Sequence, residues 1–250
     1  HQALLVGHAQ QRGGGHGSGM GGLSANLRSS PDASVMAPNP TPASTGLPAA
    51  VGEGLVLGPA DAEARLVLLH GWGADADDLL DLGELLVGPQ VSVVALRAPE
   101  AHPYGMGRQW YGLQPIDWGQ LPAARAALHS RLAALASSVP LERTVILGFS
   151  QGGAMALDVG SGLPLAGIVT CSGYPHEGWR PAPAAGQPLP PVLLSHGRED
   201  PVVPYAASEA VLDTLAEAGA QVRLLPFSGG HTIDQAVLPE IASFVRRCLA

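Results

Sequence analysis

Lysine is missing from this chain, and the 13 basic residues among its 250 are all arginines. This absence excludes a P-loop lysine, a pyridoxal Schiff base and a catalytic Ser-Lys dyad. Acidic residues outnumber the arginines, so the net charge is −8. A partner with a phosphate backbone would require a basic surface stripe. The sequence therefore predicts no nucleic acid partner.

Cysteine and long apolar runs are scarce as well. Cys171 and Cys248 lie far apart, without a CxxC spacing or a histidine cluster that would hold zinc, so we expect buried free thiols. No apolar run approaches the roughly 18 residues that a membrane-spanning helix needs. We expect no membrane span and a cytoplasmic protein.

The residues that are present fall into two parts. Residues 1–50 are rich in glycine and proline, as at Gly13-Gly14-Gly15 and Pro38, and lack apolar periodicity, which predicts a flexible tail. Met36 is a candidate start, and the residues before it are then a cloning or read-through artefact. Residues 51–250 have the length of a single domain.

Short apolar runs alternate with helical periodicity throughout residues 51–250. Strands are predicted at 55–57, 65–70, 91–96, 144–149, 165–171, 191–196 and 222–226. Helices are predicted at 77–86, 121–135, 151 to 160 or 162, 205–218 and 233–248, the last restarting at Pro239, with an irregular stretch at 98–118. The alternation predicts an α/β fold with a mostly parallel sheet and helices on both faces. Active residues are then expected at the carboxyl ends of strands.

The stretch from Thr144 to Ala154 joins an apolar strand to a helix through a turn of small residues. Within it, Gly148-x-Ser150-x-Gly152 matches a nucleophile elbow, in which the serine sits on a strained turn above the sheet. Glycine is needed two positions before and after the serine, because a Cβ there would collide where strand and helix come close. Ser150 is therefore the predicted nucleophile.

A serine hydroxyl needs a base within hydrogen-bond reach and an acid that orients the base. The histidines downstream of Ser150 are His176, His196 and His231. His231 is the predicted base, because it follows the last strand in a small-residue loop that lets an imidazole project over the sheet edge. His196 ends a strand and is predicted to be structural.

The acid is expected between Ser150 and His231 in the chain. Several acids lie on predicted helices, where acids are usually solvated: Asp158, Glu209, Asp213 and Glu217. Glu199 and Asp200 instead stand just past the end of a strand. Asp200 is preferred because Pro201 restricts its backbone to an extended conformation, and Glu199 is the alternative.

Two backbone amides are expected to bind the oxyanion that develops on the substrate carbonyl. One belongs to Gln151, directly after the nucleophile. The other is predicted at Trp72, because the turn His70-Gly71-Trp72-Gly73 follows an early strand and its glycines allow close backbone approach. The alternative for this turn is a simple connection from strand to helix.

These motifs resemble the phospholipase/carboxylesterase family of α/β-hydrolases, which includes small bacterial carboxylesterases and acyl-protein thioesterases. The resemblance covers about residues 51–250 and rests on the motifs LHGWG (69–73), AP (98–99), WY (110–111), GFSQGG (148–153), HGREDPVVP (196–204) and GH (230–231). It implies the α/β-hydrolase fold and no metal or organic cofactor. It also implies these site residues: Ser150, Asp200 and His231 as the triad, and Trp72 and Gln151 as oxyanion donors. Many members carry leucine in place of Trp72 and aspartate in place of Gly112.

The predicted reaction is hydrolysis of a carboxylic ester, with short-chain acyl esters as the first choice, through an acyl-enzyme. A thioesterase or lysophospholipase with the same residues is the alternative, followed by a relic that binds a ligand without turnover. Little sequence separates the strands, so we expect no large cap domain and a shallow site. The loop expected to border it contains Met106, Trp110, Tyr111 and Trp118, with Trp110 as the predicted substrate contact. A homodimer is compatible with the sequence.

Overall fold

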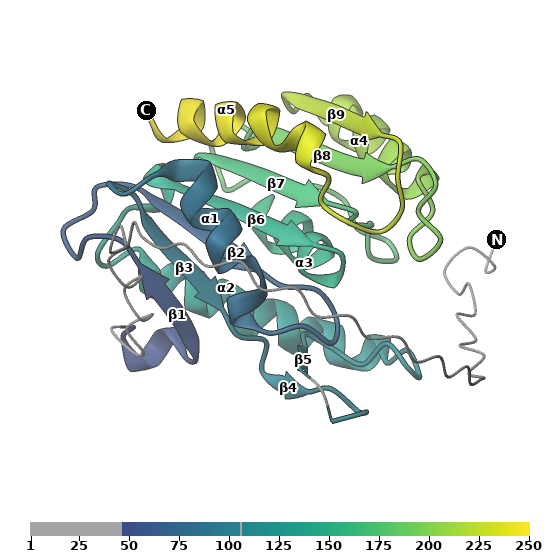
Figure 1. Ribbon diagram of the computed structural model, residues 1–250, viewed down its shortest axis with the longest axis horizontal. Helices are drawn as coiled ribbons and strands as arrows, with labels where there is room; N and C mark the ends of the chain where they lie inside the picture. The colour runs from purple at the N-terminus through teal and green to yellow at the C-terminus, as the bar shows by residue number, and fades with distance from the viewer. Residues whose placement is uncertain (1–46, 106) are drawn as a thin grey trace, which may run out of the picture.

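The computed structural model describes residues 47–105 and 107–250 (Figure 1). The tail predicted for residues 1–50 therefore lies, up to residue 46, outside the described residues, and so does Met106. Leu47, the first described residue, lies upstream of the predicted boundary and packs against the core, and Val51 is fully buried in the 3₁₀ turn Ala49–Val51.

Strands and helices alternate along the described chain. The strands are β1 (Gly54–Leu57), β2 (Arg65–Leu69), β3 (Ser92–Leu96), β4 (Glu100–Ala101), β5 (Arg108–Gln109), β6 (Thr144–Phe149), β7 (Gly167–Cys171), β8 (Val192–Gly197) and β9 (Val222–Phe227). The α-helices are α1 (Leu80–Val87), α2 (Leu121–Leu135), α3 (Gln151–Gly160), α4 (Ala206–Glu217) and α5 (Leu238–Leu249). Further 3₁₀ turns lie at Ala76–Leu79, Trp118–Gln120, Leu141–Arg143 and Gln235–Val237.

The longer strands form one seven-stranded sheet in the order β1-β3-β2-β6-β7-β8-β9 (Figure 1). Strand β1 runs antiparallel to β3, and the other neighbouring pairs are parallel. Parallel strands run in the same direction, because crossover connections return the chain to the starting edge. The carboxyl ends of the parallel strands therefore share one edge of the sheet. The predicted α/β fold is confirmed, and the loops after β2, β6, β8 and β9 meet at that edge.

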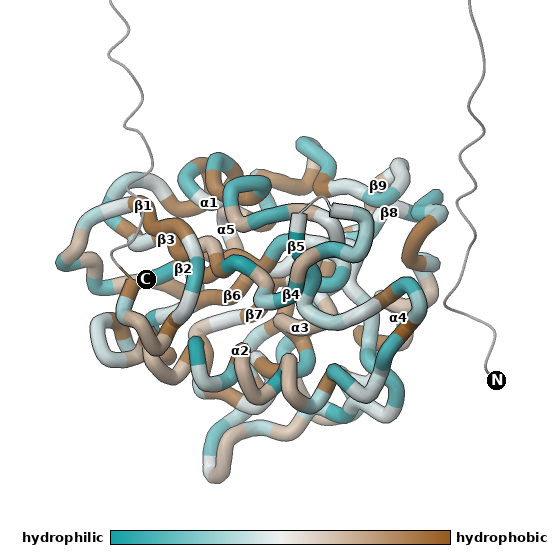
Figure 2. Tube along the Cα trace, turned by 90° about the horizontal axis from the view of Figure 1, so that it is seen from below, coloured by the Kyte–Doolittle hydropathy of each residue, from teal (hydrophilic) through white to brown (hydrophobic). Residues whose placement is uncertain are grey.

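Apolar layers cover both faces of the sheet. In β2, Leu66 and Leu68 belong to the cluster that contains α1 and α5, whereas Val67 and Leu69 belong to the cluster that contains α2, α3 and α4. This double burial explains why the strand is apolar at consecutive positions. Figure 2 shows hydrophobic chain around β1, β3 and β6, and hydrophilic chain in many of the outer loops.

The first predicted helix is divided in two. A 3₁₀ turn at Ala76–Leu79 precedes α1, and Asp75 caps it by accepting a hydrogen bond from the amide of Ala76, while Asp78 accepts one from the amide of Asp75. This reciprocal arrangement is a capping box, which satisfies amides that lack helical partners. The C-terminal helix begins at Leu238, one position before the predicted restart at Pro239.

The predicted irregular stretch contains the small antiparallel hairpin β4–β5. Strands of two residues are too short to give a periodic pattern. Cys171 and Cys248 are both free thiols, the first buried and the second half-buried, and burial raises the pKa of Cys171 to about 12. Within the described ranges, no helix is long and apolar enough to cross a membrane.

Candidate active site

Ser150 occupies the turn between β6 and α3. Its backbone has φ 53° and ψ −117°, a conformation that residues other than glycine rarely adopt. Gly148 and Gly152 allow the turn, because a Cβ on Gly148 would overlap the carbonyl oxygen of Gly152, and one on Gly152 would overlap that of Leu69. This is the strand-to-helix geometry that the elbow pattern predicts.

Two side chains from loops after later strands form a hydrogen-bonded line that ends at Ser150. His231 follows β9, and its Nε2 lies 2.9 Å from the Ser150 Oγ, across 81 positions of sequence. The Nδ1 of His231 lies 2.7 Å from Oδ2 of Asp200, which follows β8. With Nδ1–H donating to the carboxylate, Nε2 can accept the serine proton. The structure brings together the three residues named from the sequence.

The carboxylate of Asp200 is enclosed and paired. Its Oδ1 accepts hydrogen bonds from the amides of Val202 and Val203 at 2.8 and 2.9 Å, and Nε2 of His196 lies 3.2 Å from Oδ2. Burial by itself raises the pKa of Asp200, but the hydrogen bonds from His231 and the two amides outweigh it and lower the pKa below its ordinary value. Asp200 is therefore ionised at neutral pH.

The alternative residues occupy supporting positions. Glu199 accepts a hydrogen bond from the amide of Gly229 at 2.5 Å, which anchors the loop after β9. His196 is fully buried, with Nε2 donating to the carbonyl of Val203 at 2.9 Å and Nδ1 accepting from the hydroxyl of Ser208 at 2.6 Å. These contacts agree with the structural role predicted for His196.

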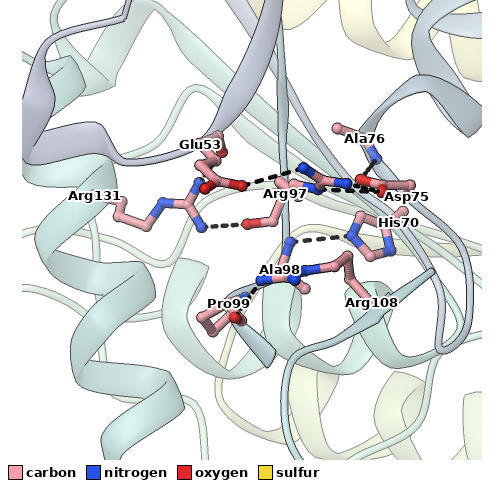
Figure 3. Close-up of polar contacts among 9 residues, drawn as sticks. All are labelled: Glu53, His70, Asp75, Ala76, Arg97, Ala98, Pro99, Arg108 and Arg131. Carbon is pink, nitrogen blue, oxygen red and sulfur yellow. Dashed lines mark hydrogen bonds and ion pairs between the residues drawn. The ribbon is translucent and has the colours of Figure 1, made fainter. Parts of the chain in front are cut away.

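His70 follows β2 directly and orients the peptide bond after Gly71. The amide of Ala98 donates to Nε2 of His70 at 3.1 Å (Figure 3). The ring proton is therefore on Nδ1, which donates to the carbonyl of Gly71 at 2.8 Å. Burial lowers the pKa of His70, against the opposing effect of the bond to Gly71. The Gly71 carbonyl and the Trp72 amide share one planar peptide, so His70 also orients the Trp72 amide.

The amides of Trp72 and Gln151 are unpaired beside the nucleophile. Neither donates a hydrogen bond to any acceptor within residues 47–105 and 107–250. Gly71 lies against Ser150, since a Cβ on Gly71 would be 3.5 Å from the Ser150 Cβ. Gln151 begins α3, where the first amides of a helix lack intrahelical partners. Both predicted oxyanion donors are therefore available.

The side chain of Gln151 has a role that sequence analysis missed. It is completely buried, accepting from the amide of Trp110 at 2.9 Å and donating to the carbonyl of Tyr111 at 2.8 Å. Trp110 is 2% exposed, and its indole N–H donates to the carbonyl of His70 at 2.9 Å. The aromatic pair thus supports the elbow and the oxyanion loop from the core, and substrate contact by Trp110 stays a prediction. The sequence signal that could have indicated this role was the amide side chain of Gln151 directly after the nucleophile.

A buried Asp–His pair lies where the sequence predicted a solvated acid. The Asp158 side chain, on α3, is 2% exposed, with Oδ2 2.6 Å from Nδ1 of His176 and Oδ1 3.0 Å from the Arg125 guanidinium. Nε2 of His176 lies 2.8 Å from the Tyr111 hydroxyl, which is 2.7 Å from that of Tyr174. The expectation for Asp158 was wrong because α3 is buried along its whole length.

Arginines anchor the loop after β3, next to the oxyanion turn (Figure 3). Arg108 donates hydrogen bonds to the carbonyls of Ala98 and Pro99. Arg97 pairs with the carboxylate of Asp75 at 2.6 Å. These bonds fix the loop in which the Ala98 amide donates to His70 and so sets the tautomer of His70. Guanidinium groups suit this role because each offers several donors in a fixed plane.

A family model described as Phospholipase/Carboxylesterase matches residues 55–249. The chain belongs to the phospholipase/carboxylesterase family. The family resemblance inferred from the motifs is confirmed. The solved structure of esterase PE8 is also similar, with 33% identity and a TM-score of 0.68, over 78% of this chain and 98% of PE8. It supports the α/β-hydrolase fold that the resemblance implied.

Curated relatives in this phospholipase/carboxylesterase group include a thioesterase and an esterase. Acyl-protein thioesterase 1 of Neurospora crassa is 36% identical over 116 residues, which are 44% of this chain and 47% of that protein. Esterase YpfH of Escherichia coli is 28% identical over 184 residues, which are 69% of this chain and 78% of that protein. The chain thus spans about half the length of the Neurospora relative.

Proposed function

We propose that this family member is a serine hydrolase that cleaves carboxylic esters through an acyl-enzyme on Ser150. The observation that carries the proposal is the unbroken line of hydrogen bonds from Asp200 through His231 to the Ser150 hydroxyl. A hydroxyl on a strained turn, an imidazole and a paired carboxylate are the nucleophile, base and orienting acid that this chemistry requires.

The first half of the reaction forms the acyl-enzyme. Nε2 of His231 takes the Ser150 proton while Oγ bonds to the ester carbonyl carbon, and Asp200 stabilises the imidazolium. The amides of Trp72 and Gln151 donate to the oxyanion. When the intermediate collapses, the carbon–oxygen bond to the alcohol breaks, and the alcohol leaves with the proton held by His231.

The second half hydrolyses the acyl-enzyme. A water molecule gives a proton to Nε2 of His231 as its oxygen bonds to the acyl carbon, and the same two amides again stabilise the oxyanion. Collapse breaks the bond to Oγ, returns the proton to Ser150 and releases the carboxylic acid. The two halves consume one ester and one water and need no other reactant.

The preferred substrate is a small neutral ester with a short acyl chain, since a net charge of −8 disfavours anionic substrates. Thioesters are the second candidate, because one relative is named acyl-protein thioesterase 1 and the same residues would act on them. A panel of nitrophenyl esters of increasing acyl length, with an acyl-CoA and a lysophospholipid as competitors, separates these substrates. The expected result is the highest kcat/KM at short acyl chains.

Labelling with a fluorophosphonate tests the nucleophile. Mass spectrometry of the labelled full chain is expected to place the adduct on Ser150, because the base and oxyanion donors activate this hydroxyl. Ser150→Ala is expected to abolish labelling and to lower kcat on nitrophenyl acetate by on the order of 10⁶-fold, whereas the exposed Ser137→Ala control keeps both. Full activity of Ser150→Ala would overturn the proposal.

A further inference from the structure

A cleft of about 440 Å³ runs from His231 toward α1. Its volume lies within the range of small-molecule pockets, about 300–1,000 Å³. The lining comes from the turn after β2, with Gly71 and Ala74, from the start of α1 and from the loop after β9. The apolar side chains that line it are Leu79, Leu82, Phe149, Ile233 and Leu238. Such a lining suits a group that is itself apolar.

Phe149 connects the cleft to the nucleophile. It is the residue between Gly148 and Ser150, and its ring centre lies 4.8 Å from that of His231. A Cβ on Gly71 would lie 3.2 Å from Cδ1 of Phe149. The Phe149 ring therefore lies against both His231 and the oxyanion turn, and His231 is 2.9 Å from the Ser150 Oγ, so the cleft adjoins the nucleophile.

The position of His231 decides which half of an ester enters the cleft. Nε2 of His231 returns its proton to the alcohol oxygen as the intermediate collapses, so that oxygen must lie within hydrogen-bond reach of Nε2. The carbonyl oxygen is directed at the amides of Trp72 and Gln151. The alcohol is therefore the substituent on the His231 side, and His231 forms part of the cleft wall.

We infer that this cleft binds the alcohol moiety of the substrate, an inference that rests on the proposed function. The apolar lining selects a bulky neutral alcohol, such as an aryl alcohol. Asp78 is an acidic side chain on the cleft, exposed and bonded to the amide of Asp75 at 2.5 Å. Its negative charge disfavours an anionic group on the alcohol. The substrate class is thus an ester of a bulky apolar alcohol with a short acid.

Leu82→Trp tests this assignment by filling the cleft from α1. The substrates are ethyl acetate and 1-naphthyl acetate, which differ in the alcohol, and phenyl acetate and phenyl hexanoate, which differ in the acid. The ratio of kcat/KM for naphthyl over ethyl acetate is expected to fall about tenfold, a size typical of apolar pocket changes. The hexanoate-to-acetate ratio is expected to stay constant. Leu85→Trp is the matched control on the same helix, because Leu85 is 62% exposed and lines a groove toward α5 instead.

Pre-steady-state kinetics add a second readout. The acetyl-enzyme no longer contains the alcohol, so Leu82→Trp is expected to slow the acylation burst with naphthyl acetate and to leave the deacylation rate unchanged. Leu82→Ala, which enlarges the cleft, is expected to raise the ratio of kcat/KM for naphthyl acetate over ethyl acetate. This variant replaces Leu82→Trp in the test if the tryptophan variant does not fold.

Two results would overturn the assignment. A changed hexanoate-to-acetate ratio with a constant alcohol ratio would place the acyl chain in the cleft, and two constant ratios would show that no part of the substrate enters it. Labelling of wild-type Ser150 by a small fluorophosphonate is measured on a separate sample alongside these rates. Loss of that labelling in the wild-type protein would instead contradict the proposed function, so the two failures are distinguishable.

Discussion

Two arrays in the described part of the chain join a carboxylate, an imidazole and a hydroxyl by hydrogen bonds. The elbow array consists of Asp200, His231 and Ser150. The core array consists of Asp158, His176 and Tyr111. The distances are 2.7 and 2.9 Å in the elbow array and 2.6 and 2.8 Å in the core array. The acid, the base and the distances are nearly the same in the two arrays.

The arrays differ at the hydroxyl. Ser150 lies at positive φ, beside a cleft and two unpaired amides. Tyr111 is fully buried, burial raises its pKa far above the ordinary value, and its hydroxyl is also bonded to Tyr174. Both arrays therefore contain a hydrogen-bonded acid, base and hydroxyl, but they differ in features that the proposed acyl transfer requires. Backbone strain, access to substrate and oxyanion donors distinguish the elbow array.

The same substitution in each array is expected to give the largest contrast. Asp200→Asn should lower kcat by about 10⁴-fold, because an amide in place of the carboxylate favours the wrong tautomer of His231. Asp158→Asn should leave kcat near the wild-type value, because the core array does not touch the substrate. Steady-state kinetics on nitrophenyl acetate measure both. A near-normal rate for Asp200→Asn would transfer the role to Glu199, which Glu199→Gln then tests.

Removal of the imidazole from the core array is expected to affect stability instead of rate. His176→Leu leaves the Asp158 carboxylate buried without its closest partner, and breaking a buried pair in this way costs about 3 kcal/mol of unfolding free energy. Urea unfolding measures the loss, and His129→Leu, at an exposed position on α2, is the control. A large loss of kcat with unchanged unfolding would mean that the core array takes part in the reaction.

A smaller effect on rate is expected from the residue that orients the oxyanion turn. His70→Phe removes the donor to the Gly71 carbonyl and should lower kcat by roughly 10- to 100-fold with little change in KM, since loss of a whole oxyanion donor costs about 10²–10³. His70→Asn keeps an amide donor near the position of Nδ1 and should recover part of the rate. Equal rates for wild type and His70→Phe would exclude this positioning role.

The smallest effect is expected for the unfolding free energy at acidic pH, where wild type is compared with Asp200→Asn. The folded pKa of Asp200 is below its ordinary value, so its contribution to stability is complete above the unfolded pKa of about 4 and is lost as pH falls through the folded pKa. Wild type should therefore lose more unfolding free energy than Asp200→Asn between about pH 4 and 2. Urea unfolding at several pH values measures the two slopes, and coincident slopes would contradict the prediction.

Features that depend on neighbouring residues were predictable from the sequence. Consecutive apolar residues in β2 indicated a strand buried on both faces, and the glycines around Ser150 indicated the elbow, because both signals arise within a few positions. Asp200 was chosen over Glu199 from the proline that follows it, and the structure directs Asp200 toward His231 and Glu199 toward Gly229.

Features that depend on packing were not predictable. The local sequence around an acid on a helix does not show whether that side of the helix is solvated or buried. Asp158 was therefore assigned to the surface. The hydrogen bonds of the Gln151 side chain to Trp110 and Tyr111 join segments about 40 positions apart. No local pattern encodes such a contact.

The sequence by itself determined the elbow turn at Ser150 and the alternation of strands and helices, because steric needs and hydrophobic periodicity act over short stretches of chain. Only the tertiary structure decided that a second acid, Asp158, meets His176 in the core. Both Asp–His pairs use the same residue types, at separations of 31 and 18 positions. Burial of α3 sends one pair into the core, and the shared carboxyl edge of parallel strands brings the other to the serine.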